Sequence, residues 1–131
     1  MTLDRREFLL AAGAVALGTR TLAATSSTGT GMHGLIGRMI AVDGKRDELI
    51  AILLEGTGAM PGCLSYIVAK DQQDANAIWV TEVWESGEAH ANSLTIPAVR
   101  QAIARGMPII AKFEGHATTT PVGGVGVAAG R

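Results

Sequence analysis

The strongest constraint on the fold is a strand–helix–strand pattern that occurs twice in succession between residues 34 and 120. Apolar residues alternate with a period of two in the strand-like segments and recur every three or four positions in the helical ones. In chain order, we expect a strand over 34–42, a helix ending near 55, strands over 63–70 and 76–85, a short helix ending near 94, a helix starting at 97, and a strand over 109–120. The order β-α-β-β-α-β predicts an α+β ferredoxin-like fold, in which an antiparallel sheet carries its helices on one face.

Local signals place the starts of the three helices. Asp43 precedes the first helical pattern and is expected to cap it, and Ser86 is the expected N-cap of the short helix. Pro97 suits the first position of the last helix, since its missing N–H would lack an intrahelical partner there anyway.

The third strand pattern separates two tryptophans. Successive side chains of a strand point to opposite faces, so Trp84 and Glu82 share one face with Ile78 and Val80, while Trp79 lies on the other. If the helices cover the first set, Trp84 and Glu82 point into the gap between sheet and helices. The second face is then uncovered, and an apolar sheet face of this size predicts a homodimer packed sheet against sheet, with Trp79 in the interface.

Four residues suggest a site in this gap, and each also has a simpler explanation. Trp84 could be only a core residue, and Glu82 could form an ion pair with Arg38 on the neighbouring strand. His90 in the short helix could be solvated, and Tyr66 could merely cover a sheet edge. Together, an aromatic wall, a carboxylate and an imidazole on one side of a small sheet indicate a site for a polar aromatic ligand.

The ends of the chain differ from the central pattern. Residues 1–24 join a charged start containing "DRREFL" to a short apolar run, which predicts a twin-arginine-type export signal and a periplasmic or secreted protein with no stable membrane span. An amphipathic N-terminal helix is the alternative. We expect a flexible linker over 25–33 and a flexible tail over 121–131.

Composition narrows the classes of partner. The 11 basic and 12 acidic side chains nearly balance, and no basic run interleaves with aromatics, so nucleic acid is not an expected partner. Cys63 is the single cysteine and has no His or Cys at metal-ligand spacing, so no metal site is predicted.

Four short segments carry a resemblance to a known family. "GKRDEL", "MPGCLSY", "EVWESGEAH" and "TIPAVRQAI" resemble the antibiotic biosynthesis monooxygenase domain, which includes quinol monooxygenases, over about Gly34 to Thr119. The resemblance implies a dimer in which two ferredoxin-like sheets form an α+β barrel, in agreement with the pattern above.

The resemblance also implies an activity: oxidation of a quinol, phenol or polyketide-like aromatic by O2 without a cofactor. The implied catalytic residues are His90 as base or proton relay, Trp84 as pocket wall and Glu82 as the group that orients His90 or Arg38. The implied substrate contacts are Arg38, Tyr66, Val80, Asn92 and Arg100, and Arg105 is a further candidate.

Two other functions stay open. Val80 stands where cofactor-free oxygenases of this family carry an asparagine, which favours a non-catalytic dimer that binds a small aromatic. Haem handling is a weaker alternative, because the segment 34–42 has no asparagine of the kind that haem-degrading relatives use.

Overall fold

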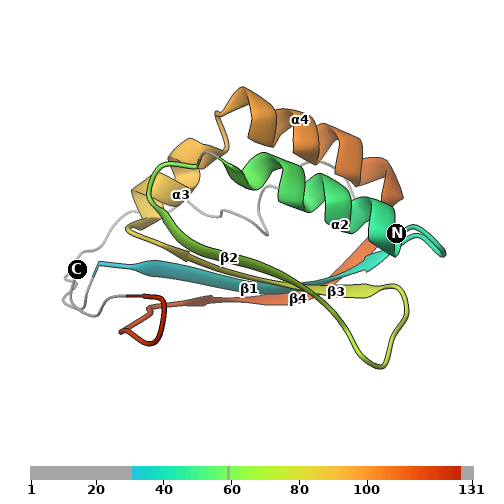
Figure 1. Ribbon diagram of the computed structural model, residues 1–131, viewed down its shortest axis with the longest axis horizontal. Helices are drawn as coiled ribbons and strands as arrows, with labels where there is room; N and C mark the ends of the chain where they lie inside the picture. Colours follow the sequence, from blue (N-terminus) through green and yellow to red (C-terminus); the bar gives the residue numbers. More distant parts are fainter. Residues whose placement is uncertain (1–30, 59, 128–131) are drawn as a thin grey trace.

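A computed structural model describes residues 31–58 and 60–127 and confirms the ferredoxin-like α+β fold (Figure 1). The export signal expected over 1–24 and most of the expected linker lie outside these residues. The elements, in chain order, are β1 (His33–Ala41), α2 (Arg46–Glu55), the 3-10 turn η3 (Gly56–Gly58), β2 (Cys63–Lys70), β3 (Ala77–Trp84), α3 (Gly87–Ser93), α4 (Pro97–Gly106), the 3-10 turn η4 (Met107–Ile109) and β4 (Ile110–Thr119).

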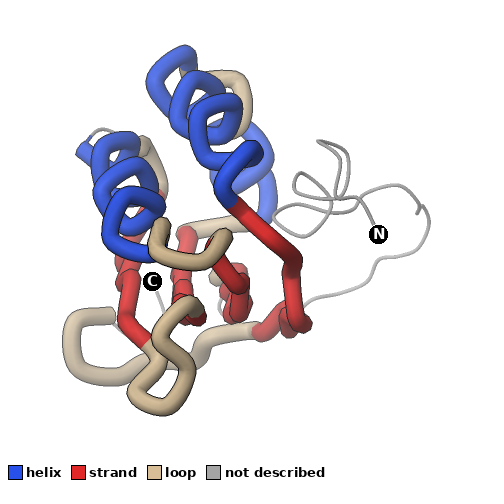
Figure 2. Tube along the Cα trace, turned by 90° about the vertical axis from the view of Figure 1, so that its right-hand side faces the viewer, coloured by secondary structure: helices blue, strands red, loops and turns tan. Residues whose placement is uncertain are grey.

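The four strands form one antiparallel sheet in the order β2-β3-β1-β4. The helices lie together on one face of it, which we call the helix face, and the opposite face is the open face (Figures 1 and 2). Register fixes the face of each residue: Gly37 of β1 lies opposite Val80 of β3, and Arg38 lies opposite Trp79. Arg38 and Trp79 therefore belong to the open face.

The hydrophobic core lies between the sheet and the helices. Leu49 of α2 and Ile78 of β3 are fully buried, and both belong to its central cluster. Burying one such side chain contributes roughly 1.5–3 kcal/mol. The remaining buried members of the cluster are Met39, Ala41, Val80 and Ile110.

Two of the three expected helix starts are confirmed and one is wrong. Ser86 caps α3, because its Oγ accepts a hydrogen bond from the backbone N–H of Ala89 at 3.0 Å, and Pro97 is the first residue of α4. Asp43 does not cap α2, which follows Lys45 without a side-chain cap. Asp43 lies in the preceding turn, where its Oδ1 accepts a hydrogen bond from Asn76 Nδ2 at 3.1 Å.

The outer strand β4 departs from regular pairing with β1. Arg38 pairs with Gly115 and Met39 pairs with Phe113, so Glu114 is an extra residue in a β-bulge. A bulge shifts the alternation of the strand beyond it. Phe113 and His116, which are three residues apart, therefore both lie on the helix face.

Two structural features lie just outside the expected domain of residues 34–120. Met32 is buried, and β1 begins at His33, one residue before the expected domain boundary. Past Thr119, Gly124 and Val127 form an isolated antiparallel bridge. None of the helices in the described part is long and apolar enough to cross a membrane.

Candidate functional site

A cavity of about 70 Å³, here called the inner cavity, lies between the helix face and the helices. Its polar lining comes from both sides: Glu82 and Tyr66 from the sheet, His90 and Ser93 from α3. The rest is largely apolar and consists mainly of Leu49, Leu53, Met60, Trp84, Leu94, Val99, Ala102 and Ile103. An apolar cavity with a few convergent polar groups is the usual form of a small-molecule site.

Glu82, Trp84 and His90 meet at one end of this cavity. Glu82 and Trp84 are two residues apart in β3, so their side chains share the helix face, and Trp84 Nε1 donates a hydrogen bond of 2.8 Å to Glu82 Oε1. The Ser86 cap starts α3 directly after β3, which brings His90 over the strand. Its Nε2 lies 3.8 Å from Glu82 Oε1, and its ring centroid lies 5.2 Å from that of Trp84. The structure thus brings the three expected catalytic residues together.

The surroundings disfavour the charged form of both members of this pair. Burial raises the pKa of Glu82 to about 7, although the hydrogen bond from Trp84 acts in the opposite direction. Burial also lowers the pKa of His90 to about 4, and His33 lowers it further. Because His90 is only 3% exposed, its neutral form is strongly favoured. At neutral pH the imidazole is uncharged, and Glu82 is the group of the pair that changes charge.

His33 belongs to the site although the sequence placed it in a linker. It begins β1 opposite Trp84, and its ring stacks on that of His90 with centroids 5.6 Å apart and planes at 26°. Burial lowers the pKa of His33 as well. The sequence could not show this contact, because it depends on the pairing of His33 with the end of β3.

Tyr66 lies beside Glu82 on the neighbouring strand β2, opposite it in register. Burial, and then the charge of Glu82, raise the pKa of the Tyr66 phenol above its ordinary value. The same two causes, in the same order, raise the pKa of the Cys63 thiol. Both groups therefore stay protonated near neutral pH, and Tyr66 offers the inner cavity a neutral hydroxyl.

A second cavity of about 100 Å³ adjoins the first, and we call it the Gly37 cavity after the residue in its floor. Glu82, Tyr66 and Leu53 line both cavities, so these side chains stand where the two meet. Val80, an expected substrate contact, is buried and lines the Gly37 cavity. The other lining residues include Leu35, Met39, Phe113 and His116.

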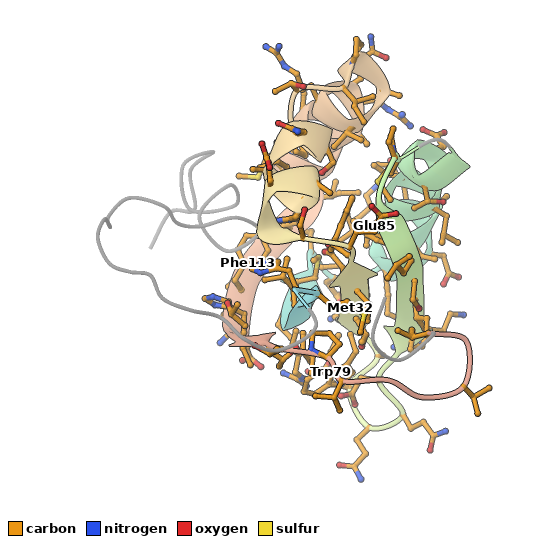
Figure 3. The ribbon with its side chains drawn as sticks, turned by 90° about the vertical axis from the view of Figure 1, so that its left-hand side faces the viewer. Met32, Trp79, Glu85 and Phe113 are labelled. Carbon is orange, nitrogen blue, oxygen red and sulfur yellow. The ribbon has the colours of Figure 1, made fainter. Side chains whose placement is uncertain are left out.

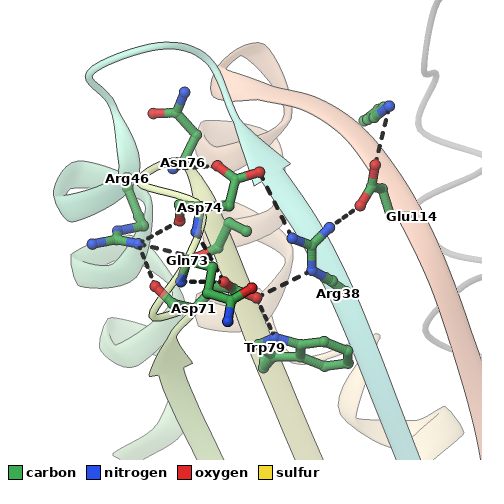
Figure 4. A network of polar contacts seen from close by, with 10 residues as sticks. Arg38, Arg46, Asp71, Gln73, Asp74, Asn76, Trp79 and Glu114 are labelled. Atoms are coloured by element: carbon green, nitrogen blue, oxygen red, sulfur yellow. Dashed lines mark hydrogen bonds and ion pairs between the residues drawn. The ribbon is translucent and has the colours of Figure 1, made fainter.

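Arg38 lies on the other side of the sheet from Glu82, and the ion pair considered between them is wrong. On the open face its guanidinium pairs with Asp71 at 3.4 Å, with Asp74 at 3.7 Å and with Glu114 (Figure 4). It also lies 5.7 Å from the ring centroid of Trp79. Figure 3 shows Trp79 on the side of the sheet away from the helices. The Arg38 side chain is thus directed away from Glu82, although the residue is part of the lining of the Gly37 cavity.

Three other expected contacts lie on the surface of the helices. Asn92 of α3 and Arg100 of α4 are exposed, and neither lines the inner cavity or the Gly37 cavity. Arg105 is also exposed, and its guanidinium pairs with Glu55 of α2. Their helices pack on the sheet through other faces, so these residues do not converge with Glu82.

Several lining residues were not expected, because only the folded arrangement brings them together. The additional lining residues are mainly Leu49, Leu53, Thr57, Met60, Ser93 and Ile103.

Within residues 31–58 and 60–127, no group of three or more His, Cys, Asp or Glu side chains is placed to hold a metal ion.

The comparisons with known proteins agree with this architecture. The family model described as antibiotic biosynthesis monooxygenase matches residues 32–105. The crystal structure of a candidate antibiotic biosynthesis monooxygenase from Chloroflexus aurantiacus is 59% identical to the chain, with a TM-score of 0.70 over 71% of this chain and 95% of that one. A search of curated proteins gave no match.

More distant structures share the fold. A candidate antibiotic biosynthesis monooxygenase from Caulobacter crescentus is 21% identical, with a TM-score of 0.65 over 71% of this chain and 92% of that one. A similarly described protein from Bacteroides thetaiotaomicron is 17% identical, with a TM-score of 0.62 over 70% of this chain and 90% of that one.

Proposed function

The chain belongs to the antibiotic biosynthesis monooxygenase family, and on that premise we propose that it oxidises a quinol or phenol with O2 and without a bound cofactor. The observation that carries the proposal is the Glu82 carboxyl, whose side chain is only 15% exposed, which stands where two apolar cavities meet and whose pKa is raised to about 7. A general base works best when its pKa lies near the working pH.

The proposed reaction starts with a proton transfer from the substrate hydroxyl to the Glu82 carboxylate. The resulting aryloxide gives one electron to O2, and the two radicals combine to form a carbon–oxygen bond. Loss of water then breaks the O–O bond and leaves a quinone. For a phenol with a free para position, one phenol and one O2 yield one quinone and one water, so the substrate supplies all the electrons.

His90 takes a different role in this proposal from the one its residue type indicates. A neutral imidazole with a pKa of about 4 is a weak base, but it can donate or accept a hydrogen bond. We assign proton removal to Glu82 and assign to His90 the positioning of the aryloxide or of the oxygen intermediate. Trp84 fixes Glu82 through its N–H and closes that end of the inner cavity.

Oxygen uptake tests the proposal. Wild-type protein is mixed in a chelating buffer with a panel of phenols and quinols, and uptake is compared with that of heat-denatured protein. With ¹⁸O2, we expect one labelled oxygen in the quinone and one in water. Hydrogen peroxide with no label in the product would indicate an oxidase instead. If ligands raise the Tm but no panel member gives uptake, the chain is a non-catalytic binder.

We also propose that the open face holds a second copy of the chain. Ile67 is 56% exposed and Trp79 is 40% exposed on this face, which the helices leave uncovered. Ile67→Lys should convert a dimer to a monomer in light scattering, whereas Leu54→Lys, on an exposed position of α2, should not. A wild-type monomer at micromolar concentration would contradict this assignment.

A further inference from the structure

The floor of the second cavity is made by a glycine that the backbone does not require. Gly37 lies in the interior of β1, opposite Val80 on one side and His116 on the other. It is not one of the glycines with positive φ. A β-carbon added there would meet only Gly115 O and His116 Cβ, both at 3.9 Å, which is ordinary contact.

Glycine in a strand interior weakens the strand and leaves no side chain to pack, so it often marks a place where something else approaches the backbone. Here the helix face above Gly37 is hollow, and the cavity is lined by Leu35, Met39, Val80 and Phe113. The absence of a side chain at Gly37 therefore creates part of the empty volume.

The sizes of the cavities limit what can enter. The inner cavity measures about 70 Å³ and the Gly37 cavity about 100 Å³. An engineered apolar cavity of about 150 Å³ holds one benzene ring, so neither cavity alone is large enough. A ring must extend across both, past the three residues that they share, Glu82, Tyr66 and Leu53.

We propose that Gly37 is the residue that sets substrate size, and that the site takes a single-ring hydroxyarene lying across the two cavities. The ring hydroxyl contacts Glu82 at the junction, and one ring edge lies over the Gly37 backbone. The exposed His116 at the rim marks where the Gly37 cavity opens to solvent. A substituent on the ring edge over Gly37 can therefore extend into solvent at that point. This inference rests on the site assigned under the proposed function.

Binding without oxygen tests it independently of turnover. Phenol, 1,4-dihydroxybenzene and 1-naphthol are titrated anaerobically against the full chain, with intrinsic tryptophan fluorescence and Tm shift as readouts. The variants are Gly37→Ala and Gly37→Val. Gly58→Val is the matched control, because a β-carbon at Gly58 meets nothing within 4 Å and Gly58 lines neither cavity.

We expect wild type to bind the two single-ring ligands and to bind 1-naphthol at least tenfold more weakly. Gly37→Val should weaken single-ring binding at least tenfold, Gly37→Ala should weaken it less, and Gly58→Val should leave it unchanged. The unliganded Tm of both Gly37 variants should equal or exceed that of wild type. If Gly37→Val destabilises the fold, the single-ring affinity of Gly37→Ala relative to that of wild type tests the inference instead.

Unchanged affinity in both Gly37 variants would overturn the inference, and so would equal affinity for 1-naphthol and phenol or no binding of any ring. Binding that depends on Gly37 but is followed by no oxygen uptake would support the inference while contradicting the proposed reaction.

Discussion

Two carboxylates on opposite faces of the sheet make the same hydrogen bond and respond in opposite ways. On the helix face, Glu82 accepts the indole N–H of Trp84 at 2.8 Å. On the open face, Asp71 accepts the indole N–H of Trp79, also at 2.8 Å. The pKa of Glu82 is raised to about 7, whereas the pKa of Asp71 is lowered to about 2.

The difference comes from the rest of the surroundings. Beyond the Trp79 bond, Asp71 accepts backbone N–H bonds from Gln73 and Asp74 and a bond from Arg38 (Figure 4). Among the described residues, the only group within ion-pairing distance of Glu82 is His90, and its imidazole is neutral. One indole bond therefore does not decide the charge of a carboxylate, because burial without a cation outweighs it. The helix face therefore keeps a carboxyl available for proton transfer.

The largest expected effect comes from removing the titratable carboxyl. Glu82→Gln keeps an oxygen that can accept the Trp84 N–H but cannot take a proton, so kcat/KM should fall by about 10²- to 10⁴-fold. The measurement is oxygen uptake with the best substrate of the panel. Asp71→Asn and Glu85→Gln, the latter at an exposed position, are the matched controls and should retain wild-type activity. An equal loss in Asp71→Asn would remove the functional distinction between the two faces.

Next in size is the effect of pH on stability. The folded pKa of Glu82 is raised above its unfolded value of 4.5, so its contribution to stability is present below pH 4.5 and is lost as pH rises through about 7. At 1.36 kcal/mol per pKa unit, the loss is on the order of 3 kcal/mol. The pKa of His90 is lowered, so His90 has the opposite sign: its contribution is present above pH 6.5 and is lost as pH falls through about 4.

Urea unfolding between pH 4 and 8 separates these contributions. The stability of wild type relative to Glu82→Gln should decline steadily across this range, because only wild type carries the Glu82 contribution. In Glu82→Gln the histidine contribution is no longer opposed, so that variant should gain stability from pH 4 to 6.5. A wild-type advantage that grows with pH would mean that Glu82 is an ionised member of an ion pair.

A smaller effect should follow when the two indoles are shortened. Trp84 is only 1% exposed, and Trp84→Phe leaves the Glu82 oxygen without its donor, so unfolding should become easier by about 1–3 kcal/mol. Trp79→Phe should cost less than about 1 kcal/mol in a monomer, because water can replace the lost bond at an exposed site. Equal losses of stability in Trp84→Phe and Trp79→Phe would indicate that the open face is buried in an assembly.

The smallest effect concerns acid stability on the open face. The pKa of Asp71 is lowered, so its contribution is present above pH 3.8 and is lost as pH falls through about 2. Wild type should therefore lose stability relative to Asp71→Asn between pH 4 and 2, as judged from urea midpoints. A constant difference over that interval would show that Asp71 has an ordinary pKa.

The sequence predicted the parts of this molecule that depend on local periodicity. The period of two in β3 was sufficient to separate Trp79 from Trp84 and to place Glu82 beside Trp84, because alternation needs no knowledge of the neighbouring strands. The order of strands and helices likewise follows from the pattern of apolar residues and turn signals. The N-cap at Ser86 was readable because its bond is made within the same segment.

The remaining features depend on register and burial. The position of Arg38 and Glu82 on adjacent strands permits an ion pair between them, but the register places Arg38 opposite Trp79. His33 joined the site through its pairing with the end of β3, which no local pattern reveals. The shifted pKa values of Glu82 and His90 follow from desolvation, and desolvation is set by the whole fold rather than by residue type.

The bulge at Glu114 gives the open face a charge without altering the cavity behind it. Deleting that one residue would restore regular alternation along β4 and leave Phe113 and His116 on the helix face, opposite Met39 and Gly37. What would be lost is the carboxylate that pairs with Arg38. A length difference of one residue in this strand among relatives would thus change the charge of the open face while the rim of the Gly37 cavity stayed the same.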